Sequence, residues 1–331
     1  MIDVSGVGFY VHPVFMGVRY LDTLFTSLSS VLVIVLMVAV GYLFGRKGWM
    51  KAEHKGLIIK LIINVGMPAL CFNNVFSNFT RESIASMGYY LLLPLGSMLI
   101  SIAFSILLCR LLKIEKRREG GFVVMCSLSN TIFVGLPMCK GLFGDEAVMY
   151  VMFFYIVNTT LFWTLGNYLL MRSGEGNGGH VELKKLLTPP LISIAVFIPL
   201  FLIGFEPPKL LLSLSSYLSG IVTPLALLYV GFLLCEGGIR NIRIDRGLSA
   251  VMVIRFLIAP AITLGLCALM GVDGIARETF VIESAMPVMT QAVVVAGNVG
   301  ADEKHLAEGM SLTTLACFVV VPLLMFVISL L

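Results

Sequence analysis

Long hydrophobic runs separated by short polar connections dominate the sequence. The first run, residues 23–45, holds 23 residues and no charged side chain. As an α-helix it is long enough to cross a hydrocarbon core of roughly 30 Å. Nine further runs follow, so the pattern predicts an all-α polytopic membrane protein with ten transmembrane helices. The expected spans are residues 23–45, 56–73, 86–112, 120–141, 147–170, 188–204, 210–235, 247–270, 277–298 and 306–330.

The runs fall into two successive groups of five. Because five is odd, the second group enters the membrane from the side opposite to the first. A shift of about 157 residues also superimposes Asp145-Glu146 on Asp302-Glu303. We therefore expect two inverted five-helix repeats, an architecture found in many alternating-access carriers. The expected organisation is an N-terminal extracytoplasmic segment (1–22), a first repeat (23–170), a flexible cytoplasmic linker rich in glycine and charge (171–187) and a second, inverted repeat (188–331).

Lys and Arg residues are distributed unevenly between the connections. The odd-numbered connections hold sixteen basic residues and the even-numbered ones hold four. Basic connections stay on the cytoplasmic side of a membrane. With ten spans, both termini are therefore expected to be extracytoplasmic. The net charge of +4 is then a signal of topology and requires no nucleic-acid partner.

Composition narrows the class of protein further. Hydrophobic residues make up 58% of the chain and charged residues 13%, against about 25% charged residues in a soluble domain. The seven cysteines show no Cys-x-x-Cys spacing and the four histidines are widely separated. The sequence therefore predicts no disulfide framework, no structural metal site and no cofactor. The spans also carry no nucleophile with a neighbouring base, which argues against an enzyme.

The fourth span carries polar residues and a proline where a membrane helix is normally apolar. Lipid offers no hydrogen bonds, so Ser129, Asn130 and Thr131 need partners from protein or water. Pro137 lacks an amide hydrogen and crowds the carbonyl four residues earlier, and Gly135 eases departure from the helix. We therefore expect the fourth span to kink or unwind at Pro137 beside a binding site. The alternative is a simple bend, with the hydroxyls bonded to their own helix.

The ninth span has the same character. Pro287 displaces the carbonyl of Glu283 from the helix, so a free carbonyl and a carboxyl group belong to one residue. Oxygen ligands suit a hard cation such as sodium, and a desolvated carboxyl group suits an exchangeable proton. We therefore expect Glu283 to carry a coupling Na+ or H+, with Gln291 facing the same cavity. The alternative is that Glu283 is a hydrated span end.

One arginine and two prolines complete the unusual residues of the spans. Arg255 lies nine residues after Arg246, about 13 Å along a helix, which is deep for a charged side chain. Either it attracts an anionic substrate or pairs with an acid such as Glu283, or it snorkels to the interface. Pro68 and Pro224 occupy corresponding places in the two halves, and they are either hinges or tolerated kinks.

Several short motifs in a fixed order resemble the auxin efflux carrier family, within the superfamily that includes bile acid, arsenite and riboflavin transporters. The resemblance spans essentially the whole chain. The motifs are Ser129-Asn130-Thr131-Ile132-Phe133-Val134-Gly135-Leu136-Pro137, Phe143-Gly144-Asp145-Glu146-Ala147, Val157-Asn158, Trp163-Thr164-Leu165-Gly166 and Ala285-Met286-Pro287.

The resemblance implies two inverted repeats whose fourth and ninth helices are broken and cross at Pro137 and Pro287. It also implies an elevator-type movement, a homodimer and a substrate carboxylate bound near Asn130 and Asn158. The chain departs from the bile acid relatives by placing proline where they carry a glutamine. The residues that resemble their sodium ligands are Ser129, Asn130 and Glu283.

Together these features predict a secondary active transporter that moves a small organic anion across a bacterial cytoplasmic membrane. Its expected partners are that anion, membrane lipid and a second copy of the chain. The alternative is a membrane sensor or scaffold that binds an organic acid without net transport. The expected substrate-binding residues are Asn130, Thr131, Pro137, Asn158, Arg255, Pro287 and Gln291; those for the coupling ion or proton are Ser129, Asn130 and Glu283; the hinges are Pro68, Gly135 and Pro224.

Overall fold

The computed structural model describes residues 13–78, 87–174, 187–237 and 242–329, and the chain is helical throughout most of these ranges. Most of the expected linker and of the expected N-terminal segment lies outside the described residues. The first half contains α1 (Pro13–Arg46), η1 (Ala52–His54), α2 (Lys55–Lys60), η2 (Leu61–Gly66), α3 (Met67–Asn78), α5 (Met87–Leu111), α6 (Lys116–Ser127), η3 (Thr131–Gly135), α7 (Leu136–Phe143), α8 (Ala147–Leu161), η4 (Phe162–Gly166) and α9 (Asn167–Ser173). The second half contains α10 (Pro189–Leu202), α11 (Lys209–Gly220), α12 (Val222–Gly237), α13 (Arg246–Val253), η7 (Ile254–Ile258), α14 (Ala259–Met270), α15 (Gly274–Ser284), α16 (Thr290–Val299) and α17 (Glu303–Ser329).

Each hydrophobic run of the sequence coincides with one helix or with consecutive helices. The prediction of an all-α membrane protein is therefore confirmed for the described residues. Six segments are long and apolar enough to cross a membrane: Ala52–Ser77, Gly88–Leu111, Ala147–Ser173, Lys209–Gly237, Arg246–Met270 and Glu303–Ile328. Four shorter apolar helices cover the remaining runs: Val31–Arg46, Thr131–Phe143, Pro189–Leu202 and Thr290–Val299.

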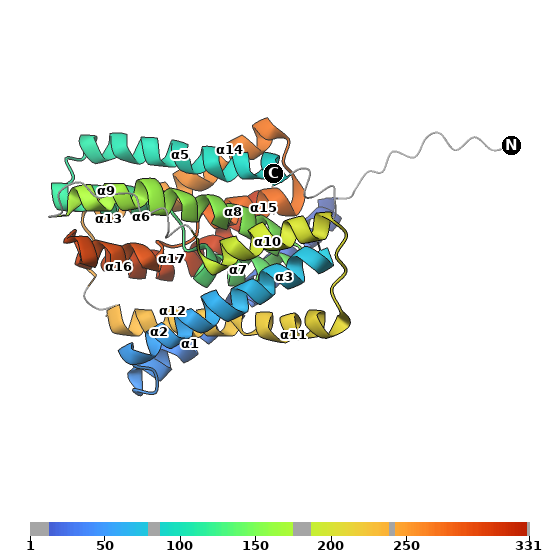
Figure 1. Ribbon diagram of the computed structural model, residues 1–331. Helices are drawn as coiled ribbons and strands as arrows, with labels where there is room; N and C mark the ends of the chain where they lie inside the picture. The colour runs from blue at the N-terminus through green and yellow to red at the C-terminus, as the bar shows by residue number, and fades with distance from the viewer. Residues whose placement is uncertain (1–12, 79–86, 175–186, 238–241, 330–331) are drawn as a thin grey trace.

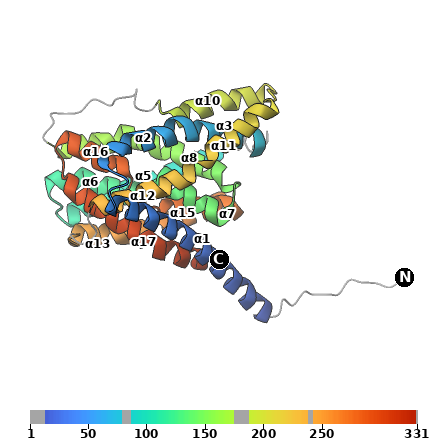
Figure 2. The same ribbon diagram turned by 90° about the horizontal axis from the view of Figure 1, so that it is seen from below.

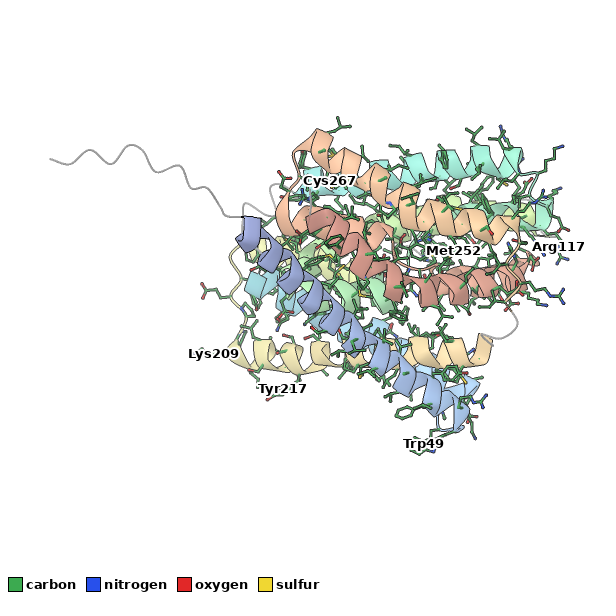
Figure 3. The ribbon with its side chains drawn as sticks, turned by 180° about the vertical axis from the view of Figure 1, so that it is seen from behind. Trp49, Arg117, Lys209, Tyr217, Met252 and Cys267 are labelled. Carbon is green, nitrogen blue, oxygen red and sulfur yellow. The ribbon has the colours of Figure 1, made fainter. Side chains whose placement is uncertain are left out.

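Large apolar side chains cover the outer surface. Leu210, Tyr217 and Leu269 are 77%, 82% and 84% exposed, and Figure 3 shows Tyr217 on α11 pointing away from the other helices. Water would make such a surface unfavourable, whereas a bilayer provides lipid as its partner. The surface therefore fits a chain that crosses a membrane several times.

The helices lie in roughly parallel layers (Figure 1). α5 and α14 form one edge, α6, α8 and α15 lie next to them, and α1, α11 and α12 lie at the opposite edge. α3, α10 and α11 gather on one side, away from α13 and α17 (Figure 2). Where α1 and α12 cross, Gly41 faces the Leu228 carbonyl and Gly231 faces the Val38 carbonyl, with no room for a Cβ atom. Small residues allow this close approach.

Prolines follow widened helical turns at three places. η2, η3 and η7 are π-helical, and Pro68, Pro137 and Pro260 each come two residues later. A π-turn rearranges the hydrogen bonds that a proline ring would otherwise disrupt. The expectation that the fourth span unwinds at Pro137 is therefore wrong in position, because the chain leaves the helix at residues 128–130. Pro224 lies in the first turn of α12, after the end of α11.

Charged side chains join three helix ends on one side of the molecule. Arg118, at the start of α6, pairs with Asp245 before α13 (Nη1–Oδ2, 2.9 Å) and with Asp302 before α17 (Nε–Oδ2, 2.7 Å). All three residues belong to odd-numbered connections, which the alternation of spans places on one side. Figure 3 shows Arg117 at this end and Lys209, from an even-numbered connection, at the opposite end.

Arg118→Ala is expected to lower the free energy of unfolding by about 1 kcal/mol, because partly exposed ion pairs contribute little individually. Burial raises the pKa of the Asp302 carboxyl group, but the His305 backbone N–H and the Arg118 guanidinium outweigh it, so this pKa lies below its usual range. The stabilisation is therefore complete above the usual pKa of about 3.9 and is lost as the pH falls through the lower folded value. Thermal unfolding at several pH values measures this effect, with the exposed Lys116→Ala as control. Equal Tm values for wild type and Arg118→Ala near neutral pH would contradict it.

Candidate functional site

Two helical segments are interrupted and meet at their interruptions. Residues 128–130 separate α6 from η3, and residues 285–289 separate α15 from α16. Within these stretches Ser129 and Val288 form an isolated antiparallel bridge. The second interruption contains Pro287, as its missing amide hydrogen predicts. The fourth and ninth segments of the sequence analysis are therefore joined through their own backbones.

The side chain of Asn158, on α8, completes this backbone pairing. Its Oδ1 accepts a hydrogen bond from the Ser129 N–H (3.0 Å), and its Nδ2 donates to the Ser129 carbonyl (2.9 Å). Ser129 and Asn158 are only 1% and 2% exposed, so water is a poor substitute for these bonds. The amide of Asn158 therefore holds the first interruption in shape.

Asn130 connects the helices that leave the two interruptions. Its N–H donates to the Pro287 carbonyl (2.8 Å). Its Oδ1 accepts from the Phe133 N–H (3.3 Å) and thereby caps η3. Its Nδ2 donates to Thr290 Oγ1 (3.2 Å), at the first residue of α16. Asn130 thus keeps the N-terminal ends of η3 and α16 together.

A pocket lies where these two helix ends face α8 and η2. The space in which the centre of a water molecule fits is small, about 30 Å³. Helix N-termini present unpaired N–H groups and the positive end of the helix dipole, so both ends favour an anion. Hydroxyl and amide side chains add further hydrogen-bonding groups. The lining residues are Ile63, Ser129, Asn130, Thr131, Ile132, Phe133, Tyr155, Asn158, Thr159, Met289, Thr290 and Gln291.

The carboxyl group of Glu283 is enclosed by protein and does not line this pocket. It is fully buried, Oε1 accepts from the Cys139 thiol (3.6 Å), and Oε2 has no hydrogen-bond partner among the described residues. A Cβ atom at Gly135 would lie 2.5 Å from Oε2 and 2.7 Å from Cδ. Because Gly135 has ordinary helical dihedral angles (φ −61°, ψ −53°), its absent side chain serves close packing, and nothing in its geometry supports the expected hinge.

Arg255, in η7, is fully buried against both interruptions. Nε donates to the Met125 carbonyl (2.7 Å), and Nη2 donates to the Leu128 carbonyl (2.6 Å). Nη1 donates to the Met286 carbonyl (2.5 Å) and to Ser129 Oγ (3.1 Å). The ion pairs of the described residues include none between Arg255 and Glu283. Arg255 therefore neither snorkels nor lines the pocket, and backbone carbonyl groups are its main partners.

The structure brings some predicted site residues together and separates others. Pro68 lines a different groove, between α3, α10 and α11, and Pro224 lies in the first turn of α12. Five predicted residues do not line the pocket: Pro287 within the second interruption, Glu283 and Arg255 next to the interruptions, and Gly135 and Pro137 further along the fourth segment. The predicted residues that do line it are Ser129, Asn130, Thr131, Asn158 and Gln291.

The sequence analysis missed three polar residues of the pocket. Tyr155 and Thr159 lie three residues before and one after Asn158 on α8, so the three share one helix face. This spacing around Asn158 could have identified Tyr155 and Thr159 as part of the same polar face from the sequence. Thr290 immediately precedes Gln291, and only the position of the second interruption reveals it as the start of a helix.

Comparisons with known proteins place the chain among transporters. A family model described as membrane transport protein matches residues 26–182 and 178–325. A transporter of Methanocaldococcus jannaschii, described as uncharacterized, is 26% identical over 303 residues, covering 89% of this chain and 97% of that protein. One from Methanothermobacter thermautotrophicus is 26% identical over 300 residues, covering 90% and 97%. A transporter of Saccharomyces cerevisiae, also described as uncharacterized, is 23% identical over 161 residues, or 46% of this chain and 25% of that protein.

Proposed function

Since the chain belongs to the membrane transport protein family, which is the auxin efflux carrier family, we propose that it is a secondary active transporter for a small organic anion. Carboxylates and dicarboxylates are the substrate class. The pocket between the two helix N-termini carries this proposal, because it offers an anion two positive dipole ends and many neutral donors. Neutral donors hold an anion without trapping it as strongly as a fixed positive charge would.

The proposed architecture is ten transmembrane helices in two inverted five-helix repeats, with both termini outside the cytoplasm. The agreement of the hydrophobic runs with helices and the shared side of the odd-numbered connections support it. We place the protein in a bacterial cytoplasmic membrane as a homodimer surrounded by lipid. No feature of the pocket calls for nucleic acid.

An elevator-type movement fits the way the helices are grouped. α1 packs on α12, and α3 packs on α10 and α11, which together form one body. The interrupted helices pack on α5, α8, α9, α13, α14 and α17, and η3 and α7 also pack on α12 and α1 of the first body. The pocket lies between the two bodies, since Ile63 of η2 faces residues of the interruptions and of α8. Sliding one body past the other would carry a bound anion between the two sides of the membrane.

Glu283 is the proposed coupling residue. A buried carboxylate whose hydrogen bond comes from a thiol is costly in an apolar environment, so this group is expected to bind a proton or a cation. Its carboxyl group packs on η3, whose N-terminus faces the pocket. Protonation at Glu283 and anion binding in the pocket are therefore linked through one short helix.

Flux into proteoliposomes tests the proposal. Wild-type protein is expected to accumulate a labelled carboxylate or dicarboxylate when a proton gradient is imposed. Asn130→Ala should reduce this uptake at least tenfold, because it removes the link between the two helix N-termini; Asn73→Ala, on α3, is the matched control. The Glu283→Gln protein should still exchange labelled for unlabelled substrate when both sides of the membrane hold equal concentrations. Its uptake should no longer respond to the proton gradient. Ligand binding without flux under any gradient would contradict transport and favour the membrane sensor.

A further inference from the structure

The crossing is the place where the two interruptions, residues 128–130 and 285–289, meet. We propose that the Arg255 guanidinium is a built-in cation of this crossing, and that it occupies the place where a free alkali-metal ion would otherwise have to bind. It binds three carbonyl oxygens at once: Met125 in the last turn of α6, Leu128 in the first interruption and Met286 in the second. The contacts of Arg255 do not depend on whether the protein transports a substrate. Only the consequence for the coupling ion rests on the proposed function.

The groups around Arg255 form a cation site by their chemistry. α6 and α15 both end beside it, and the end of a helix carries unpaired carbonyl groups and a negative dipole charge. Carbonyl and hydroxyl oxygens are also the ligands of hard cations such as Na+. Three carbonyl groups and the Ser129 hydroxyl converge here within 3.1 Å of guanidinium nitrogens. A positive charge is therefore required at this point, and the chain supplies its own.

The planar guanidinium matches these partners better than a point charge would. It has five N–H donors in a fixed arrangement, and the contacts above use four of them. Arg255 is fully buried and no ion pair of the described residues neutralises it. Its charge is thus balanced by the two helix ends, which it holds together.

The arrangement divides the crossing into two electrostatic halves. The helices that enter the interruptions, α6 and α15, direct their C-terminal ends to Arg255. The helices that leave them, η3 with α7 and α16, direct their N-terminal ends to the pocket. Because Arg255 already supplies a positive charge at the C-terminal ends, no sodium ion is needed there. Protonation of Glu283 then remains as the means of coupling.

Thermal unfolding of the purified full chain in detergent tests this without a known substrate. Wild-type protein should have the same Tm in sodium and in choline at equal ionic strength. Arg255→Ala should have a lower Tm, and low-millimolar guanidinium should raise it by several degrees with saturation. Arg255→Lys should lie between the two, because an ammonium group keeps the charge but reaches fewer carbonyl groups. Arg246→Ala, on the exposed start of α13, is the control and should resemble wild type.

Two results would overturn the inference. One is a sodium-specific rise in the Tm of the wild-type protein, which would show that a free cation site exists beside Arg255. The comparison of sodium with choline uses wild-type protein, so it tests the inference even if the Arg255 variants fail to fold. The other is a folded Arg255→Ala protein whose Tm responds to guanidinium no more than that of Arg246→Ala. Absence of flux in proteoliposomes would contradict the proposed function and would leave these outcomes unchanged.

Discussion

Gly135→Ala is expected to destabilise the protein severely and to abolish transport. The new methyl group would lie 2.5 Å from Glu283 Oε2 and 2.7 Å from Cδ, well inside van der Waals contact. Both residues are buried, so the carboxyl group at the end of the Glu283 side chain would have to shift within packed surroundings. Overpacking of a core typically costs about 1–3 kcal/mol, and here the displaced group is also the proposed coupling residue.

A double variant separates this steric effect from other causes. Glu283→Ala removes the carboxyl group that the methyl group would meet, so the Gly135→Ala/Glu283→Ala protein should regain most of the lost Tm. Transport by the double variant should stay uncoupled from any gradient. Gly141→Ala, on α7, is the matched control, since a Cβ atom there would meet only Ile34 Cδ1 at 3.5 Å. A double variant no more stable than Gly135→Ala alone would show that the contact with Glu283 is not the cause.

Asn158→Leu is the second substitution with a large expected effect. It would leave the N–H of Ser129 buried and unpaired and its carbonyl with only the long hydrogen bond from Thr131 Oγ1 (3.5 Å), and an unpaired buried group costs about 1–3 kcal/mol. The Tm should fall, and the pocket should lose anion binding because the extended residues 128–130 would no longer be held. Thermal unfolding and flux measured on the same preparation check both parts.

The same substitution distinguishes two roles for the amide. The resemblance to auxin efflux carriers implies that Asn158 lies near the substrate carboxylate, whereas its hydrogen bonds assign it to the backbone of Ser129. Thr159→Val, at a neighbouring position of the pocket lining, should lower substrate affinity and leave the Tm unchanged. If Asn158→Leu behaves in that way as well, Asn158 contacts the substrate and its positioning role is wrong.

The positions of the helices could be predicted because the bilayer imposes a simple rule. A segment must remain apolar over about 20 residues to cross it, and the runs starting at residues 86, 147 and 247 match helical segments starting at 87, 147 and 246. Charged connections give the alternation of sides by the same logic. Pro287 marked the second interruption correctly, but a proline alone is not a sufficient signal, because Pro94, Pro199 and Pro322 lie inside α5, α10 and α17 without interrupting them.

Contacts of the interruptions could not be predicted from residue types. Pro137 resembles Pro287 in sequence, yet a π-turn precedes it and the chain unwinds earlier, at residues 128–130. The partners of Arg255 are backbone carbonyl groups, which become available only once α6 and α15 end. A carboxylate such as Glu283 was the natural expectation for a buried guanidinium, because a sequence does not display freed carbonyl groups. The pairing of Asn158 with the backbone was hidden for the same reason.

The central claim is that the crossing holds a cation on the C-terminal ends of two helices and an anion on the N-terminal ends of the two others. An experimental structure of the protein bound to the carboxylate that it transports best tests this most directly. We predict density for the carboxylate in the pocket, within hydrogen-bond distance of the first N–H groups of η3 and α16, with Arg255 still bound to the Met125, Leu128 and Met286 carbonyl groups. Density for the anion against Arg255 itself, or uninterrupted helices at residues 128–130 and 285–289, would contradict it.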